Sequence, residues 1–318
     1  MTTRPTYQGR TLPFPDEEVV DQGLQFDLGT LLGRRRLLKV MGLGAVGVGL
    51  AACGGGASGS ASAASTTAAS SAATGTLTEI PDETNGPYPA DGTNGPDILE
   101  QSGVVRSDIR SSFGTSTTTA EGIPMTLRLT VFNLEGGQTP YAGAAVYVWH
   151  CNRAGEYSMY SSGLENENYL RGVQIADASG VVEFTSIFPA CYSGRWPHVH
   201  FEVYPDEAGI TDHDNAVSTS QLAFPQDVCD TVYATSGYEQ SVANLAQLSL
   251  STDNVFSDDS AAHQLATVTG DVTKGYVVSL DVGVDAGTAQ TGGSAPGGSG
   301  GQGGMGAPPS GMGAPPSR

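Results

Sequence analysis

Short segments in which apolar and polar side chains alternate recur along the chain between residues 125 and 284. An alternation with a period of two predicts β-strands, and these segments are also rich in β-branched and aromatic residues. Turn-forming residues separate them, as at Gly136-Gly137 and at Ala178-Ser179-Gly180. The predicted strands have the sequences TLRLTVFN, AAVYVWHC, GVVEFTSI, HVHFEVYP and GYVVSLDVGV.

Only one segment of the same region favours a helix, at residues 238–250. Many short strands at this spacing, with so little helix, are typical of an all-β domain built as an antiparallel β-sandwich. A closed β-barrel is the alternative that the pattern leaves open. We therefore expect one all-β domain over residues 76–285.

The N-terminal end of the chain differs from this middle part. Three consecutive arginines, residues 34–36, precede an apolar run at residues 40–52 that is too short to span a bilayer. The run ends in Leu-Ala-Ala followed by Cys53, and Gly33 stands where Ser or Thr is more usual. This arrangement resembles a twin-arginine export signal with a bacterial lipobox. We expect residues 1–53 to be this signal, and a lipid anchor on the cysteine after cleavage.

Two segments of low complexity flank the expected domain. Residues 54–75 are almost entirely Gly, Ala, Ser and Thr, a composition that predicts a flexible tether. Residues 286–318 are dominated by Gly, Pro and Ser, and predict a disordered tail. With the export signal, this organisation predicts a protein on the extracytoplasmic face of the cell membrane as a lipoprotein, or secreted.

Charge and cysteine content narrow the possible partners. The net charge of −19 disfavours nucleic acids and anionic membrane surfaces as partners, and makes Arg195 conspicuous because few basic residues follow Cys53. In an oxidising compartment, two of the three remaining cysteines could pair. We expect a disulfide between Cys191 and Cys229 and a buried, free Cys151. The alternative makes all three small core residues.

The segment HVHFEVYP carries two histidines one residue apart. Because side chains alternate along a strand, His198, His200, Glu202 and Tyr204 should share one face, while the apolar residues between them pack into the core. The two imidazoles would then lie side by side, within reach of one metal ion. The alternative is a polar strand face without a ligand. For Glu202 we expect exposure to solvent rather than a role beside the histidines.

Two tyrosines are placed to join this pair. Tyr192 is connected to the histidines through SGRWP, whose glycine and proline predict a turn. Tyr157 follows a turn at residues 152–155, just after an earlier predicted strand. Phenol oxygens bind as phenolates only to a strongly Lewis-acidic cation. Two phenolates with two neutral imidazoles suit iron(III) better than zinc, which prefers Cys, His and carboxylate ligands.

At these residues the chain resembles a known family. VYVWHCNRAGEYS and CYSGRWPHVHFEV resemble the two signature segments of the intradiol ring-cleavage dioxygenases, which include protocatechuate, catechol and hydroxyquinol dioxygenases. TSQLAFP, residues 219–225, resembles the glutamine-bearing strand of that family, and DETNGPYP, residues 82–89, resembles the segment that enters its catalytic domain. The resemblance spans residues 80–284 and implies an antiparallel β-sandwich.

The resemblance also implies a ligand set for non-haem Fe(3+). Tyr157 and His200 correspond to the equatorial ligands of the family, and Tyr192 and His198 to the axial pair. A tether stands where catechol dioxygenases carry a helical dimerisation segment, so the resemblance fixes no oligomeric state.

The implied reaction uses a catecholic substrate and O2. Both oxygen atoms enter the ring, which is cleaved between its two hydroxylated carbons to give a muconate-type dicarboxylate. Tyr192 corresponds to the catalytic base, Arg195 to the active-site arginine and Gln221 to the glutamine that lines the pocket. The alternative function is a non-catalytic β-sandwich lipoprotein that binds metal or ligand. A zinc hydrolase is disfavoured, because neither phenolate is a usual zinc ligand.

Several other residues near the motifs receive weaker assignments. Trp196 either reshapes the mouth of the pocket or is a surface aromatic, and Tyr88 either lines the pocket or is structural. His150 is expected to support the site from behind or to lie in the core. His213 and His263 lie in polar stretches, and we assign them no role.

Overall fold

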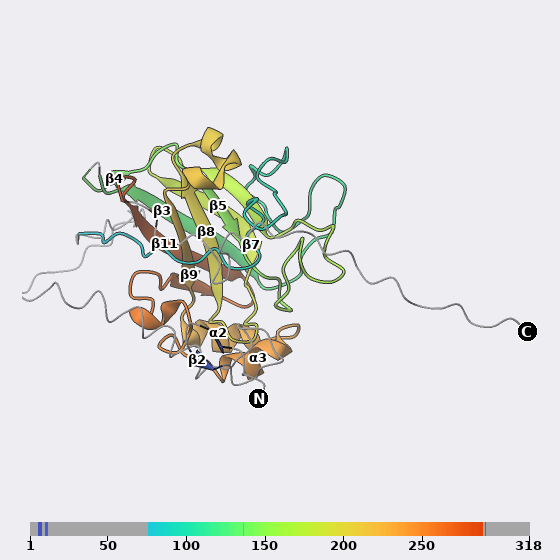
Figure 1. The fold of residues 1–318 in the computed structure, drawn as a ribbon. Coiled ribbons are helices and arrows are strands. Elements are labelled where there is room, and N and C mark those ends of the chain that lie inside the picture. The colour runs from blue at the N-terminus through green and yellow to red at the C-terminus, as the bar shows by residue number, and fades with distance from the viewer. Residues whose placement is uncertain (1–5, 8–9, 12–75, 136, 289, 291–318) are drawn as a thin grey trace, which may run out of the picture. The chain divides into compact units, whose positions relative to one another are not determined.

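The computed structural model describes residues 6–7, 10–11, 76–135, 137–288 and 290 (Figure 1). The chain divides into two compact units, residues 1–71 and residues 72–318. In the first unit, strands β1 (Thr6–Tyr7) and β2 (Arg10–Thr11) pair antiparallel. The expected export signal from residue 33 to Cys53, the tether and nearly all of the expected tail lie outside the described residues.

One sheet of the second unit has five strands, built around a long central strand, β3. Its order is β10-β11-β3-β4, and β7 also pairs with β3 (Figure 1). All pairs are antiparallel except β11 with β3, which run parallel, so the expected antiparallel sandwich contains one parallel pair. The strands are β3 (Pro124–Asn133), β4 (Thr139–Pro140), β7 (Val181–Ile187), β10 (Thr267–Asp271) and β11 (Gly275–Val284).

The other sheet has four strands in the order β6-β5-β8-β9, all antiparallel. These strands are β5 (Ala145–Trp149), β6 (Arg171–Ile175), β8 (His198–Tyr204) and β9 (Ser218–Ala223). Trp149 of β5 and Gln221 of β9 are the register partners of His200 on either side of it. The histidine strand therefore lies in the interior of this sheet.

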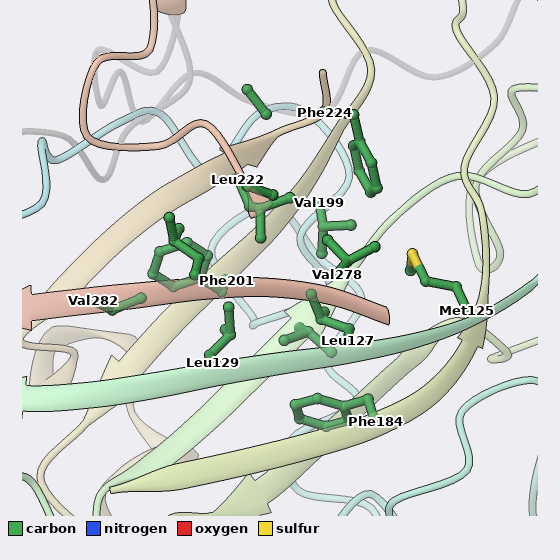
Figure 2. Close-up of a cluster of buried hydrophobic side chains, with 14 of the residues drawn as sticks. Met125, Leu127, Leu129, Phe184, Val199, Phe201, Leu222, Phe224, Val278 and Val282 are labelled. Atoms are coloured by element: carbon green, nitrogen blue, oxygen red, sulfur yellow. The ribbon is translucent and has the colours of Figure 1, made fainter. Parts of the chain in front are cut away.

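The main hydrophobic core lies between the two sheets. Figure 2 shows side chains of β3, β7 and β11 directed toward those of β8 and β9. Leu127 and Leu129 of β3 and Phe201 of β8 are at most 1% exposed. The alternation in β8 explains this arrangement, because its residues 199, 201 and 203 are the apolar ones and all belong to this core. The expected sandwich is thus observed.

A second apolar cluster covers the outer face of the four-stranded sheet. Ala90, Ile98 and Leu99, from the segment that precedes the first strand of the sandwich, pack there against Tyr147 and Trp149 of β5. Both faces of β5 are therefore buried, which explains why its sequence AVYVW is apolar without interruption. The same cover makes every residue of β8 buried, including the polar ones.

The helices are short. α2 (Gln226–Tyr233) follows β9 directly, and α3 (Glu239–Leu245) lies beside it. Single 3-10 turns are found at η3 (Glu207–Thr211), η4 (His213–Asn215) and η5 (Phe256–Asp258). The sequence pattern predicted one helix at residues 238–250, and α3 occupies the first half of that range, whereas α2 was missed. Among the described residues, no helix is both long and apolar enough to cross a membrane.

Candidate active site

Two histidines of β8 form the base of the candidate site. The Nε2 atoms of His198 and His200 lie 3.1 Å apart, and both side chains are 2% exposed. The ring of His200 stacks on Trp149 at a centroid distance of 4.8 Å and an interplanar angle of 6°. The Nδ1 atom of His198 donates a hydrogen bond to the Trp196 carbonyl oxygen, which leaves its Nε2 lone pair directed toward His200.

Tyr192 reaches the histidines from the loop before β8. Its hydroxyl oxygen lies 3.2 Å from the Nε2 atom of His198. The backbone of the preceding residue, Cys191, is held by α3 on both sides: its amide donates to Ser241 Oγ at 3.0 Å, and its carbonyl accepts from Asn244 Nδ2 at 2.8 Å. The turn that the sequence predicted thus brings this tyrosine to the histidines, and α3 holds it there.

Tyr157 completes a group of four ring side chains. Its ring centroid lies 5.9 Å from that of Tyr192 and 6.4 Å from that of His200. A turn places it there, in which Asn152 Oδ1 accepts hydrogen bonds from two backbone amides of the loop. The Tyr157 side chain is buried, and among the described residues its hydroxyl has no hydrogen-bond partner. A buried phenol without a partner is costly unless something else binds its oxygen.

Burial sets the protonation states of this group. It raises the pKa of Tyr192 to about 12 and that of Tyr157 well above its ordinary value. It also lowers the pKa of His198 to about 3 and that of His200 well below its ordinary value. Both imidazoles are therefore neutral at pH 7 and can act as ligands. Both phenols keep their protons unless a strongly polarising cation replaces them.

This donor set fits a ferric ion. The Nε2 atom of His198 lies 3.2 Å from the Tyr192 oxygen and 3.1 Å from the Nε2 atom of His200, and both spacings suit neighbouring ligands of one ion. The orphaned hydroxyl of Tyr157 offers a fourth donor. Phenolate oxygens and neutral imidazoles are hard and borderline ligands, as an oxidised iron centre prefers.

Arg195 and Gln221 lie next to the four rings and are bonded to each other. The Arg195 NH2 group donates to Gln221 Oε1 at 2.6 Å, and Gln221 in turn donates to the Thr84 carbonyl at 2.8 Å. The Nε atom of Arg195 donates to Asp253 Oδ2 at 3.0 Å. The arginine charge lowers the pKa of both histidines and of both tyrosines of the site, so its field reaches all four rings.

Three further residues shape this site and were not predicted from the sequence. Gly86, with a φ of +72°, crosses over His200 so closely that a Cβ atom would lie 3.2 Å from its Cε1. Asp253 follows α3 in the chain, and its Oδ2 also accepts from the Trp196 amide at 2.7 Å. Trp149 stacks on His200. The signal for Gly86 was its place in a Gly-Pro-Tyr sequence, whereas an isolated aspartate in a polar loop gives no signal.

Several sequence expectations are corrected here. Glu202 was expected to be exposed, but its exposure is 0%, because the segment that precedes the sandwich covers its face of β8. Trp196 lies in the main core, and its Nε1 donates to the Phe224 carbonyl at 2.9 Å, so it lines neither a pocket mouth nor the surface. The expected disulfide is absent. All three described cysteines are free and buried, and the Cys191 Sγ atom contacts the Arg195 carbonyl at 3.5 Å instead.

The remaining histidines and Tyr88 lie in different surroundings. His150 is a core residue, with its Nε2 atom 2.7 Å from Ser186 Oγ. Tyr88 is 38% exposed and its ring lies 4.9 Å from that of Tyr157, so it borders the candidate site. His213 was assigned no role but lies against two buried carboxylates, while His263 is exposed.

Comparison with known proteins gives the family. Residues 94–266, more than half of the chain, match a family model described as Dioxygenase. A chlorocatechol 1,2-dioxygenase from Rhodococcus opacus is 41% identical over 54 residues, which are 17% of this chain and 21% of that protein. The matched segment is thus only about a fifth of that relative's length.

The fold is also shared with a solved structure. An intradiol ring-cleavage dioxygenase from Tetranychus urticae superposes with a TM-score of 0.53 at 20% identity, over 67% of this chain and 97% of that one. The expected sandwich architecture and the family match therefore agree. On the strength of the family match, the protein belongs to this dioxygenase family.

Proposed function

We propose that the protein is a non-haem iron(III) intradiol dioxygenase. It would insert both atoms of O2 into a catecholic aromatic and cleave the ring between the two hydroxylated carbons, giving a muconate-type dicarboxylate. One observation carries the proposal: two tyrosines and two neutral, buried histidines converge beside a half-buried arginine. These residues are Tyr157, Tyr192, His198, His200 and Arg195.

The four ring side chains would hold the metal. Bound there, iron(III) would act as a Lewis acid and as a template that orients catechol and withdraws electron density from its ring. Tyr157 and Tyr192 would supply two negative charges that favour the oxidised ion, and His198 and His200 would bind through Nε2. Because these groups are shielded from water, their charges act more strongly on a bound substrate than they would in solvent.

Tyr192 would be the base that accepts a substrate proton. Burial raises its pKa to about 12, so its oxygen, when ionised, would readily take up a proton from a catechol hydroxyl. Its hydroxyl lies 3.2 Å from His198 Nε2, and the residue is only half-buried. Binding of substrate and movement of the proton are thus coupled at a single residue.

Arg195 would stabilise negative charge that develops on the substrate ring. Hydrogen bonds to Asp253 and Gln221 fix its guanidinium before substrate arrives. A preorganised charge in a shielded site stabilises a transition state without further rearrangement. A protein that only bound a metal would not need this arginine with its two partners, which argues against the non-catalytic binding protein.

The proposal is tested by spectroscopy and oxygen uptake on the full chain. The purified protein should contain one iron, show a tyrosinate-to-iron charge-transfer band that shifts when catechol is added without oxygen, and consume O2 when air is admitted. Tyr192→Phe and His200→Ala should lose most of the band and the activity, whereas the control Tyr141→Phe should keep both. Iron content without any oxygen uptake on a panel of catechols would favour the non-catalytic function instead.

The location of the protein is a separate proposal that rests on its sequence alone. Export through the twin-arginine route and a lipid on Cys53 would hold the enzyme at the extracytoplasmic face of the membrane. Labelling of cells with a radioactive fatty acid should mark the wild-type protein and not Cys53→Ala. Equal labelling of both would remove the lipid anchor from the proposal.

A further inference from the structure

A second cluster of potential metal ligands includes Glu202, which lies two residues after His200 on β8. Asp91, Glu202 and His213 each offer one ligand atom, and these three atoms lie within 4.8 Å of one another. The Nδ1 atom of His213 is 3.2 Å from Asp91 Oδ2 and 3.5 Å from Glu202 Oε1. The cluster is separate from the four rings described above, because none of its members belongs to them.

Two polar atoms of this cluster, Glu202 Oε1 and His213 Nδ1, lack the hydrogen bonds that their burial calls for, whereas the oxygens of Asp91 accept from Asn85 and Thr93. Glu202 is 0% exposed, and its Oε1 atom has no hydrogen-bond partner among the described residues, although Oε2 accepts from the Tyr204 hydroxyl at 2.8 Å. The Nδ1 atom of His213 is close to both carboxylates but has hydrogen-bonding geometry to neither. A buried carboxylate oxygen without a donor is costly unless a cation meets it.

We propose that Asp91, Glu202 and His213 bind one divalent transition-metal cation of the zinc type. Separations of 3.2 and 3.5 Å between ligand atoms suit an ion held at about 2.0–2.2 Å from each of them. Two carboxylates with one imidazole form a donor set for zinc, whereas calcium and magnesium prefer oxygen ligands alone. Water would complete the coordination.

The electrostatics and the access route agree with this assignment. The two carboxylates raise the pKa of His213 to about 10, so without a metal this cluster takes up a proton to supply the positive charge that it lacks. The His213 side chain is 16% exposed and borders a surface cavity of about 420 Å³ together with Asp214 and Asn215. A cation can therefore enter from solvent without disturbing the core.

The cation would fasten the segment that covers the candidate active site. Asp91 comes from that segment, Glu202 from β8 and His213 from η4, so one ion would join three parts of the chain. Five residues before Asp91, Gly86 crosses over His200 in the same segment. Asn85 also ties this segment to the cluster, since its Nδ2 donates to Asp91 Oδ2 at 3.1 Å. The site is thus structural, and it does not depend on the proposed dioxygenase activity.

The test is a metal count on the full-length protein. The chain is freed of loosely bound metal, equilibrated with Zn²⁺, separated by gel filtration and analysed by mass spectrometry. His213→Ala and Asp91→Asn should each bind one Zn²⁺ fewer than the wild type, while the exposed control His263→Ala should not. The difference should persist when every protein also carries His200→Ala, because this change weakens zinc binding at the four ring side chains of the candidate active site equally in all samples.

Thermal unfolding supplies the second measurement. At a hundredfold excess of Zn²⁺ over its dissociation constant, the wild-type melting temperature should rise by about 5 to 10 °C. The same addition should leave His213→Ala unchanged, and Ca²⁺ should have little effect on either protein. Equal Zn²⁺ content in the wild type and in both variants would overturn the proposal. So would equal melting shifts, which would leave the cluster as an ion-paired histidine alone.

Discussion

At the scale of single residues, the orientation of Arg195 depends on Asp253. This carboxylate is 0% exposed and accepts from both the Arg195 side chain and the Trp196 amide, so it fixes the arginine relative to the start of β8. Arg195 and the backbone amide hold the pKa of Asp253 below its ordinary value against the opposing effect of burial. The carboxylate is therefore charged and balances the arginine. Its position suggests that it acts through the arginine and not on the substrate.

Replacing Asp253 by Asn should test this positioning role. The amide keeps the shape but loses the charge, so the guanidinium should be held less firmly. We expect kcat to fall by about tenfold to a hundredfold at unchanged iron content. Steady-state oxygen uptake measures the rate, and an iron assay measures occupancy.

Two comparisons make this prediction specific. Asp253→Asn combined with Arg195→Ala should be no slower than Arg195→Ala alone, because both changes act on one group. Asp230→Asn, on the exposed side of α2, should behave as the wild type. If the fold decrease in kcat of the double variant equalled the product of the two single decreases, Asp253 would act independently of Arg195.

At the scale of elements, α3 positions the tyrosine loop although it contributes no ligand. Two of its polar side chains bind the amide and the carbonyl of Cys191, the residue before Tyr192. Asn244→Ala removes the bond to the carbonyl and should let the loop shift. We expect a lower kcat, by about tenfold, and a displaced charge-transfer band with iron still bound.

The matched control lies on the same helix. Gln240 is exposed on α3, and its replacement by Ala shortens a polar side chain without touching the loop. Gln240→Ala should keep the band and the rate of the wild type. If Asn244→Ala also kept both, the loop would hold Tyr192 without help from α3.

The segment before the sandwich carries a half-buried acid, Glu83, that should make stability depend on pH. Burial raises the pKa of Glu83 from 4.5 to about 8, and its Oε1 accepts from Gln264 Nε2 at 3.2 Å. The folded state binds this proton more tightly than the unfolded state. Its stability should therefore fall as the pH rises from about 4.5 to about 8.

Glu83→Gln isolates this effect, because glutamine stays neutral and keeps the acceptor oxygen. In metal-free protein, the variant and the wild type should melt alike at pH 4, and the variant should melt higher at pH 8.5. Each kcal/mol recovered corresponds to about 2 to 4 °C. The exposed control Glu100→Gln should show no such difference. A variant that melts lower at pH 8.5 would contradict the raised pKa.

At the scale of the whole molecule, the features predicted from sequence are those with local causes. Alternation within β8 predicted the common face of His198 and His200, and turn residues predicted the approach of Tyr192. What escaped prediction depends on residues distant in the chain. Glu202 is buried by a segment more than 100 residues earlier, and the parallel pairing of β11 with β3 joins opposite ends of the domain. Neither contact leaves a local pattern.

The same long-range contacts predict where the chain can be shortened. The amide of Ile80 donates to the Gly283 carbonyl at 2.9 Å, so the beginning of the second unit is tied to its last strand. A chain of residues 76–290 should keep the melting temperature and the iron content of the full protein. A chain of residues 94–290 spans the whole family match but lacks Gly86 and Asp91.

This shorter chain should lose both properties. Without residues 76–93, the outer face of β8 loses part of its cover, and Ile80 and Ala90, which are at most 3% exposed, leave their clusters. The removal of buried apolar side chains costs about 2 to 5 kcal/mol for a large one and exposes His200 to water. Thermal unfolding and an iron assay on the two chains measure the outcome. If residues 94–290 melted and bound iron as the longer chain does, the covering segment would be dispensable for the site.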